Sequence, residues 1–358
     1  MDLDQQLNLF FNFIDDSIIV IDQSQKIKFQ NKQSIALFKN DFTNQHITNL
    51  IRAPQFLDTL EKSINEKIPY TLELLIDPAS QDISQTNIFL SVSIYPSKDM
   101  YLIVMKNITD VKNLEIVRSS FIANVSHEMR TPLASIIGFL ETISSSAKDD
   151  IEATKKFLSI IEKEALRMKR LLDDLLIITK IESDEHVHPT KKVDLLHTLE
   201  IVENNFEQSL KKNNISIEKV YDDENLYVLG NQDELIQVFS NIIENSIKYA
   251  NENSKIRIQL RILEDKDIDN SVNRLFSYKY AIIQLIDESQ GIPKKHLHRL
   301  TERFYRVDEA RSKAKGGTGL GLTIVKHILN KHRGSLNIES EINKGSIFTI
   351  KIPVAPIT

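Results

Sequence analysis

Two long amphipathic helices in the middle of the chain constrain its fold most strongly. From residue 111 to about residue 146, apolar side chains recur at three- and four-residue spacing, which predicts one continuous helix. A polar segment, SSSAKDD, interrupts this pattern, and a second amphipathic helix is predicted over residues 151–181. Two helices cannot enclose a core alone, so pairing with a second copy would complete a four-helix bundle. A monomeric hairpin packed on neighbouring parts of the chain is the alternative.

The apolar face of the second helix is predicted from the same spacing. Its members are Phe157, Ile161, Met168, Leu172, Leu175 and Thr179. The opposite positions are rich in lysine and glutamate, as expected for a solvent-exposed face. The two stripes together indicate that this region forms an interface.

The first helix carries a histidine on the side away from its apolar stripe. His127 lies about 200° around the helix from Val125, and Thr131 follows one turn later on the same face as His127. Pro132 removes the N–H that would bond the Glu128 carbonyl, which loosens the helix there. An exposed imidazole with an acidic neighbour suits a nucleophile, because the carboxylate can keep one ring nitrogen protonated and the other free. An ordinary solvated histidine is the alternative.

The residues around this histidine read S-H-E-M-R-T-P-L, which resembles the H box of bacterial two-component sensor histidine kinases. The resemblance implies that His127 accepts a phosphoryl group from ATP and that Glu128 is its orienting base. It also implies that Thr131 helps to remove the phosphoryl group from a response regulator.

Composition excludes several other classes of protein. The chain has 358 residues, enough for two or three domains, with 41% hydrophobic and 27% charged residues, as in globular proteins. A net charge of −5 gives no indication of a nucleic-acid partner. The absence of cysteine excludes disulfides and thiolate chemistry. No apolar run reaches the length of a membrane span, and MDLDQQ does not resemble a signal peptide, so we expect a cytoplasmic protein.

Residues 1–110 are predicted to form a small α+β domain. A hairpin over residues 17–31 and a short helical patch, KQSIALFKN, precede strands over residues 70–76, 87–96 and 100–109. This order, with the ending N-I-T-D at residues 107–110, resembles a PAS sensor domain. The resemblance implies that this part of the chain senses a ligand or signal, whose identity the sequence does not give.

The C-terminal half alternates helices with strands. Residues 183–190 are predicted to be a linker; His186 and His188 could bind a metal there, but a solvated linker is the default. The predicted helices cover residues 195–212 and 233–250, and the predicted strands cover 255–262, 280–287, 335–340 and 346–352. Residues 264–278 are polar and are predicted to be a long loop. The pattern predicts a mixed sheet with helices on one face.

One helix of this half places polar side chains along a single face. Asn241 and Asn245 are four residues apart, and Lys248 and Tyr249 continue the face one turn later. An amide oxygen suits Mg²⁺, and a lysine can meet phosphate charge. The block N-I-I-E-N-S-I-K-Y resembles the kinase N box. The resemblance implies that Asn245 binds Mg²⁺, that Asn241 and Lys248 approach the phosphates of ATP, and that Tyr249 lies near the base.

A carboxylate ends the predicted strand 280–287. Asp287 could accept a hydrogen bond from the exocyclic amine of adenine, which guanine lacks at that position. The segment D-E-S-Q-G-I resembles the G1 box, with Gly291 retained and Ser289 in place of the first glycine. If that position required a positive φ, serine would be strained there. We therefore interpret the box as weakened.

The segment LTERFYRVDEAR resembles the F box. Phe304 is in place, and Thr301 stands where the family often has a second phenylalanine. Arg306 and Arg311 are candidates for contact with the γ-phosphate.

The segment GGTGLGLTIVKHIL resembles the G2 box, with Gly317, Gly319 and Gly321 leading into a helix. Free backbone N–H groups at a helix N-terminus suit phosphate. The segment lacks the G-K-[ST] ending of a P-loop and the register of a dinucleotide fold. Residues 291–317 are predicted to form a mobile lid over ATP.

Taken together, the five boxes imply an α+β multidomain sensor histidine kinase. Its expected parts are a PAS-like domain at 1–110, a dimerisation and phosphotransfer hairpin (HisKA type) at 111–183, and an α/β-sandwich ATP-binding domain at 191–358. The resemblance implies a homodimer that uses ATP and Mg²⁺ and passes the phosphoryl group to an aspartate on a response regulator's receiver domain. The alternatives are an ATPase of the gyrase and chaperone (GHKL) superfamily without phosphotransfer, and a signalling scaffold that has lost ATP binding.

Overall fold

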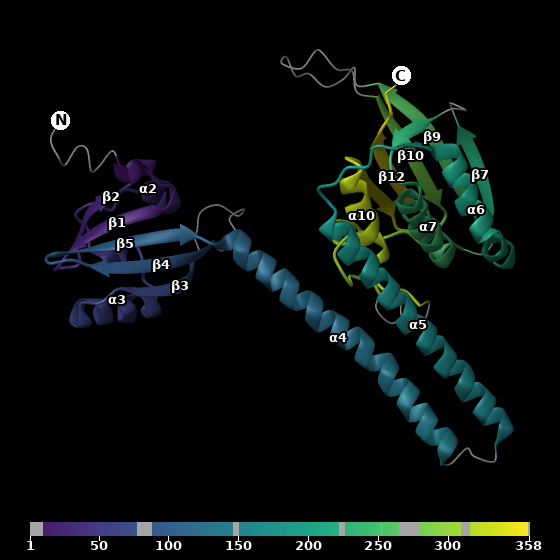
Figure 1. The fold of residues 1–358 in the computed structure, drawn as a ribbon, viewed down its shortest axis with the longest axis horizontal. Coiled ribbons are helices and arrows are strands. Elements are labelled where there is room, and N and C mark those ends of the chain that lie inside the picture. The colour runs from purple at the N-terminus through teal and green to yellow at the C-terminus, as the bar shows by residue number, and fades with distance from the viewer. Residues whose placement is uncertain are drawn as a thin grey trace. The chain divides into compact units, whose positions relative to one another are not determined.

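The computed structural model describes residues 10–76, 88–145, 150–221, 226–251, 253–264, 279–308 and 316–356. It divides into two compact units, Met1–Ala123 and Asn124–Thr358, and Figure 1 shows the elements of each. The predicted loop at 264–278 and Arg311 lie outside the described residues, apart from the backbone of Glu264 at a strand end.

The first unit is built on a five-stranded antiparallel sheet in the order β2-β1-β5-β4-β3. Its strands are β1 (Ser17–Asp22), β2 (Ile27–Gln30), β3 (Tyr70–Ile76), β4 (Ile88–Pro96) and β5 (Met100–Asn107), and its helices are α2 (Lys32–Phe38), the short 3₁₀ helix η1 (Ile47–Asn49) and α3 (Pro54–Glu66). The predicted strands are confirmed. Helix α3 was not predicted, although its signals are visible in the sequence: a proline at the start and Phe56 and Leu60 at i,i+4 spacing, both fully buried.

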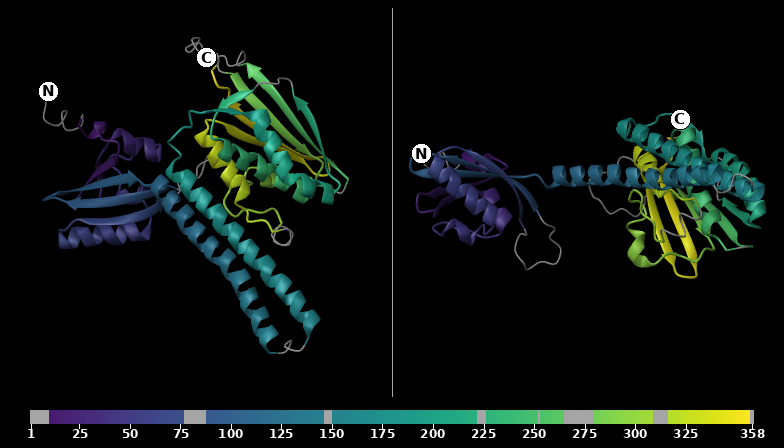
Figure 2. Two further views of the ribbon diagram at one scale, coloured as in Figure 1. Left: turned by 45° about the vertical axis from the view of Figure 1, so that its right-hand side comes forward. Right: turned by 90° about the horizontal axis from the view of Figure 1, so that it is seen from below.

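Two helices, α4 (Thr109–Ser144) and α5 (Ile151–Ser183), form the predicted antiparallel hairpin (Figures 1 and 2). Asp150 caps α5 by accepting a hydrogen bond from the Ala153 N–H at 2.9 Å. Near the closed end of the hairpin, the rings of Phe139 and Phe157 stack with their centroids 5.2 Å apart. Pro132 is buried within α4, and the helix runs through it.

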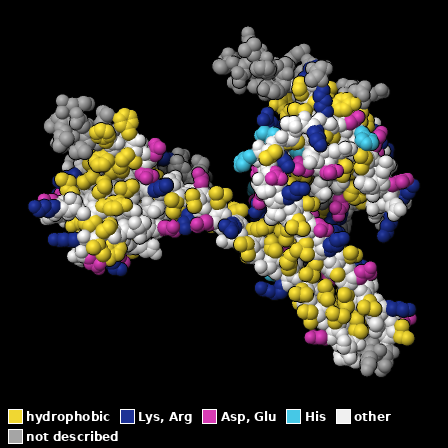
Figure 3. Space-filling model, in the orientation of Figure 1, with side chains coloured by type: hydrophobic (Ala, Val, Ile, Leu, Met, Phe, Trp, Pro, Cys, Tyr) yellow, Lys and Arg dark blue, Asp and Glu magenta, His cyan; other side chains and the backbone are white. Residues whose placement is uncertain are grey.

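Helix α5 buries an apolar face that lies beside the predicted one. Leu171, Ile178 and Ile181 are buried in the same apolar cluster as residues of α10 (Gly321–Lys331), whereas Leu172 and Thr179 remain exposed. Helix α5 therefore has two apolar stripes: one packs against α10, which the sequence did not predict, and the predicted one remains on the hairpin surface (Figure 3). Spacing alone could not separate them, because the stripes adjoin on the helix.

The rest of the second unit contains the predicted mixed sheet with helices on one face (Figure 2); the sheet has five strands in the order β11-β12-β10-β9-β7. Its strands are β7 (Ser216–Tyr221), β9 (Lys255–Glu264), β10 (Lys279–Asp287), β11 (Ser335–Glu341) and β12 (Gly345–Pro353), and its helices are α6 (Leu195–Lys212), α7 (Gln232–Tyr249), α8 (Lys294–Leu297) and α10 (Gly321–Lys331). A small sheet pairs β6 (Lys192–Asp194) with β8 (Tyr227–Leu229). Strands β6, β7 and β8 were not predicted from the sequence. Of these, β7 pairs in parallel with β9, which makes the main sheet mixed.

No helix in the part of the chain that the structure describes is long and apolar enough to cross a membrane.

The two units have separate apolar cores, which gives a test of their independence. Phe239 on α7 is fully buried in the core of the second unit. We expect Phe239→Ala to lower the free energy of unfolding of that unit by about 3–5 kcal/mol, because it leaves a cavity. The chain contains no tryptophan, so local hydrogen exchange is the suitable measurement. Faster exchange should appear in α7 and β10 and not in β5.

Leu263→Ala is the control, because Leu263 lies on β9 of the same unit and is 43% exposed. We expect it to leave exchange in α7 almost unchanged. Equal acceleration of exchange in β5 by Phe239→Ala would contradict the separation of the two cores.

Candidate nucleotide and phosphoacceptor site

A cavity of 370 Å³ lies between α7, the end of β10, the segment before α10, and α5. Ten of the predicted site residues line it: Asn241, Asn245, Lys248, Tyr249, Asp287, Gly291, Arg306, Gly317, Gly319 and Gly321. Residues from four separate parts of the sequence therefore meet at one site. Phe304 is not among the lining residues, and neither are His127, Glu128 and Thr131.

The polar face of α7 forms one wall of the cavity. Asn231 caps the helix by accepting hydrogen bonds from the N–H groups of Asp233 and Glu234. Asn241 is buried, and its amide donates to the Gly321 carbonyl at 3.1 Å and accepts from Gln237. Asn241 thus joins α7 to the start of α10. Asn245, four residues further on, is half-buried at the cavity wall.

Asp287 lies at the end of β10 with only 3% of its surface exposed. One carboxylate oxygen accepts hydrogen bonds from the backbone N–H groups of Ser289 and Ser346, at 3.0 and 3.1 Å. The other lies 3.4 Å from the Ser246 hydroxyl. Burial raises the pKa of this carboxyl above its ordinary value, against the opposing effect of these hydrogen bonds. The carboxylate is thereby fixed in orientation at the cavity wall.

The turn after Asp287 accommodates serine without strain. Ser289 does not have a positive φ, so the strain considered for this position does not arise. Gly291 does require glycine: its φ is +72°, and a Cβ would lie 2.0 Å from the Glu341 carbonyl oxygen.

Phe304 has a structural place near the site. Its backbone adopts φ +64°, its N–H donates to the Gly319 carbonyl at 2.9 Å, and its side chain packs against the main core. Gly319, with φ +76°, lies so close that a Cβ would be 2.9 Å from the Phe304 Cα. This close approach holds the glycine-rich segment in place at the start of α10.

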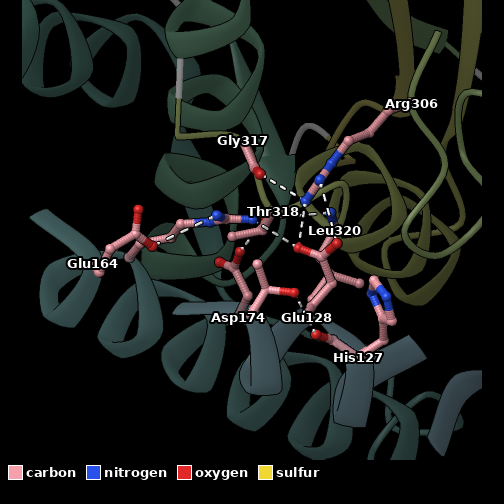
Figure 4. A network of polar contacts seen from close by, with 10 residues as sticks. His127, Glu128, Glu164, Asp174, Arg306, Gly317, Thr318 and Leu320 are labelled. Atoms are coloured by element: carbon pink, nitrogen blue, oxygen red, sulfur yellow. Dashed lines mark hydrogen bonds and ion pairs between the residues drawn. The ribbon is translucent and has the colours of Figure 1, made fainter. Parts of the chain in front are cut away.

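On α4, the histidine and its acidic neighbour point to different surroundings (Figure 4). His127 is exposed, and its carbonyl accepts a hydrogen bond from the Thr131 hydroxyl at 3.3 Å. The Glu128 carboxylate accepts a hydrogen bond from Arg167 on α5 at 2.9 Å and another from Arg306 at 3.1 Å. Glu128 is therefore held by two arginines, an arrangement that the sequence did not predict.

Helix α5 also contributes to the cavity, which sequence analysis missed. Arg170 and Asp174 line it, and Asp174 accepts a hydrogen bond from the Thr318 hydroxyl at 2.7 Å (Figure 4). Burial raises the pKa of the Asp174 carboxyl, partly offset by this hydrogen bond. No spacing signal links these α5 residues to Thr318, because the contact exists only after α5 packs against α10 and the segment before it.

Comparison with known proteins identifies both halves of this site. Residues 117–184 match the His Kinase A (phospho-acceptor) domain, and residues 230–356 match the histidine kinase-, DNA gyrase B- and HSP90-like ATPases. The phosphate regulon sensor protein PhoR of Pseudomonas aeruginosa is 32% identical over 347 residues, which cover 96% of this chain and 73% of PhoR. The chain belongs to the sensor histidine kinase family.

Two further comparisons agree with this assignment. The sensor histidine kinase WalK of Bacillus subtilis is 32% identical over 255 residues, which cover 71% of this chain and 40% of WalK. The crystal structure of histidine kinase ThkA in complex with response regulator protein TrrA matches with a TM-score of 0.51 at 21% identity, and the match covers 98% of each chain. The latter shows a shared fold. The phospho-acceptor match also separates this kinase from the gyrase-type ATPases that lack an H box.

The donor groups of the cavity fit a magnesium ion. Asn245 offers an amide oxygen at the cavity wall, and Glu244, next to it on α7, offers a carboxylate. In contrast, His186 and His188 are in no group of three or more histidine or acidic residues that could hold a metal among the described residues. The His188 ring lies 2.9 Å from the Lys331 carbonyl oxygen, so the linker contacts the end of α10.

Asp287 gives a prediction for nucleotide binding. Asp287→Asn places an amide N–H₂ where a carboxylate oxygen would accept from adenine, so we expect Mg-ATP affinity to fall at least about tenfold. The changed side chain keeps one oxygen for the two backbone N–H groups, so the fold should survive. Isothermal titration calorimetry measures the affinity, and unchanged affinity would contradict adenine recognition by Asp287.

The same substitution should alter the pH dependence of stability. Because the folded-state pKa of Asp287 is raised, the folded kinase binds a proton at the Asp287 carboxyl more tightly than the unfolded chain does. The contribution of Asp287 to the free energy of unfolding therefore falls as pH rises from its ordinary pKa of 3.8 through the folded value. We expect Asp287→Asn to remove this fall and to be at least as stable as the wild type at neutral pH. Thermal unfolding across pH checks this.

Proposed function

We propose that this kinase phosphorylates His127 from Mg-ATP and then passes the phosphoryl group to an aspartate of a response regulator. One observation supports this most directly: Arg306 contacts both Glu128, the neighbour of His127, and the Gly317 carbonyl of the glycine-rich segment, at 2.7 Å. The phosphoacceptor helix and the nucleotide cavity are thus joined by one side chain. An ATPase without phosphotransfer has no use for this connection, and a nucleotide-binding titration separates the kinase from a scaffold that has lost ATP binding.

In the proposed reaction, a neutral ring nitrogen of His127 attacks the γ-phosphorus of ATP. An N–P bond forms, the bond between the γ-phosphorus and the bridging oxygen breaks, and ADP leaves with that electron pair. The imidazole loses its remaining ring proton to a base. Glu128 is the adjacent candidate for this role, and it could act only after its carboxylate turns from Arg167 and Arg306, which hold it in the structure. Asn245 would hold Mg²⁺, which offsets phosphate charge. The chain's main contribution is positioning and charge stabilisation, as in phosphoryl transfer generally.

Other residues take the roles implied by the family boxes. Lys248 and the backbone around Gly317, Gly319 and Gly321 approach the phosphates, Tyr249 lies near the base, and Asp287 accepts from adenine. Asn241 and Phe304 have a structural role: Asn241 holds the start of α10, and Phe304 holds the glycine-rich segment. Because Ser289 is accommodated without strain, its presence in the G1 box is compatible with ATP binding.

The proposed partners are a response regulator and a second copy of the chain. ThkA forms a complex with a response regulator, and His127 is exposed on α4 for such an encounter. Large apolar side chains also remain exposed along the hairpin (Figure 3), namely Leu133, Ile137, Leu140, Leu158, Leu166, Leu172 and Leu176. Exposed apolar residues along two adjacent helices favour a four-helix bundle between two copies over a monomeric hairpin.

The first unit is proposed to act as a PAS-like sensor. Its five-stranded antiparallel sheet with α2 and α3 suits a small ligand-responsive domain. Strand β5 leads into α4, the helix that carries His127. Changes in the sensor would then alter the geometry of α4. The signal itself is an unknown ligand or condition.

The acceptor is tested by His127→Gln. We expect this variant to bind Mg-ATP with wild-type affinity and to incorporate no label from [γ-³²P]ATP, because His127 does not line the nucleotide cavity. Acid-labile, base-stable label persisting in the variant would show that another residue is the acceptor. Loss of ATP binding together with labelling would indicate a folding defect.

Thr131 is proposed to help dephosphorylate the response regulator. Its exposed hydroxyl lies one turn from His127 and could orient a water toward a docked phospho-aspartate. In the structure this hydroxyl donates a hydrogen bond to the His127 carbonyl, so the alternative is a role confined to the helix, in which Thr131 only bonds the backbone of α4. We expect Thr131→Ala to retain most autophosphorylation and to slow dephosphorylation of the purified phosphorylated regulator at least about tenfold. An unchanged dephosphorylation rate would support the role confined to the helix.

A further inference from the structure

The buried apolar stripe of α5 is interrupted by a carboxylate. Leu171, Ile178 and Ile181 are buried in the cluster that contains residues of α10. Asp174 lies between them at three- and four-residue spacing, so it shares their side of the helix. A carboxylate in such a position costs free energy unless a partner compensates it, and a single polar residue in an apolar stripe can fix the register of packing. Its partner is therefore informative.

That partner belongs to the glycine-rich segment before α10. The Thr318 hydroxyl donates a hydrogen bond to the Asp174 carboxylate at 2.7 Å and accepts one from the Leu320 N–H at 3.3 Å (Figure 4). Leu320 is the N-cap residue of α10. One hydroxyl therefore connects α5 to the N-terminus of α10. Burial raises the pKa of the Asp174 carboxyl, and the hydrogen bond from Thr318 is the largest opposing effect.

The residues on either side of Thr318 are held by other groups. The Gly317 carbonyl accepts a hydrogen bond from Arg306, and the Gly319 carbonyl accepts one from the Phe304 N–H. Both donors lie in the chain segment that follows α8. Three consecutive residues of the glycine-rich segment are thus fixed by three different groups, and the hairpin supplies the one that holds Thr318.

A second residue of α5 supports the same segment. Arg170 lies one turn before Asp174, and its guanidinium packs so closely on Gly316 that a Cβ there would be 3.0 Å from an Arg170 nitrogen. Arg170, Asp174, Gly316 and Thr318 all line the nucleotide cavity. Helix α5 therefore supports the wall of the cavity that the glycine-rich segment forms.

We propose that Asp174 is a positioning residue for ATP binding, which sets the conformation of the glycine-rich segment through the Thr318 hydroxyl. This inference rests on the proposed function, in which that segment meets the phosphates of ATP. Asp174 stands on the hairpin, so the segment takes this conformation when α5 packs against α10. The shape of the phosphate site therefore depends on the helix pair that carries His127.

The alternative is that Asp174 acts only through its charge. A carboxylate at the cavity wall repels phosphate, so its removal would then strengthen nucleotide binding. The two roles predict opposite effects of the same substitution. The hydrogen bond to Thr318 and the positive charge of Arg170 one turn away both favour the positioning role, because they offset the charge that would otherwise face the nucleotide.

The test uses the full chain and a non-hydrolysable ATP analogue with Mg²⁺, measured by isothermal titration calorimetry. We expect Asp174→Ala to weaken the analogue at least about fivefold, because the hydrogen bond that holds Thr318 is lost. The Mg-ATP concentration that gives half the maximal rate of His127 labelling should rise by a similar factor. Asp174→Asn keeps an oxygen that accepts from Thr318, so it should restore affinity to within about threefold of the wild type.

Asp173→Ala is the matched control. Asp173 is the neighbouring aspartate on α5, but it is exposed and does not line the cavity. This variant should change neither the analogue affinity nor the labelling rate.

Variants of Thr318 test the same hydrogen bond from its other end, and they decide the question if Asp174→Ala does not fold. Thr318→Val removes the hydroxyl at nearly constant volume and should weaken the analogue at least about fivefold, whereas Thr318→Ser should recover most of the affinity. The double variant Asp174→Ala/Thr318→Val should bind within about twofold of Thr318→Val alone, because the two residues act through one hydrogen bond.

Three results would overturn the positioning role. These are tighter binding by both Asp174→Ala and Asp174→Asn, additive losses in the double variant, and changes of less than about twofold in both Asp174→Ala and Thr318→Val. If the wild type neither binds the analogue nor labels His127, the proposed function itself fails, and this inference fails with it.

Discussion

The second unit of this kinase depends on one cluster of ion pairs, in which Arg167 and Arg306 hold the carboxylate of Glu128. It joins three elements that are far apart in the sequence: α4, α5 and the segment before α10. Buried ion pairs add little net stability compared with apolar packing, but breaking one is costly. The cluster is therefore better understood as a device that selects one arrangement of the hairpin on the ATPase-like part. Asp174 and Thr318 reinforce that arrangement a short distance along α5.

A second constraint comes from the central strand of the sheet. β10 pairs with β9 on one side and β12 on the other, so its last residue, Asp287, is fixed by the full ladder. Backbone N–H groups from Ser289 and Ser346 then orient its carboxylate. Rigidity of this kind suits recognition of a flat base. The glycine-rich segment across the cavity is held instead by a few contacts, such as that between Gly319 and Phe304.

Much of the fold and the site was accessible from the sequence because local chemistry specifies it. Alternating apolar residues gave the strands β1, β9 and β10, and helical spacing gave α4, α5 and α7. The polar face of α7, the position of Asp287 and the glycines before α10 pointed to one cavity, which the structure contains. The short strands β6, β7 and β8 were missed, since a few residues carry weak periodicity and gain stability mainly from tertiary packing. Helix α3 was missed although its 13 residues carry helix signals.

Sequence alone determined which chemical groups this kinase has: an exposed histidine beside an acid, an asparagine-bearing helix and a glycine-rich segment. These follow from residue identity and spacing within one element. Tertiary structure alone decided that Arg170 and Asp174 of α5 line the nucleotide cavity and that Arg306 reaches Glu128. It also decided that Leu171 and Ile178, rather than Leu172 and Thr179, are buried. The reason is physical: a helix specifies its apolar faces through periodicity, but only packing against other elements selects which face is covered and which distant charges meet.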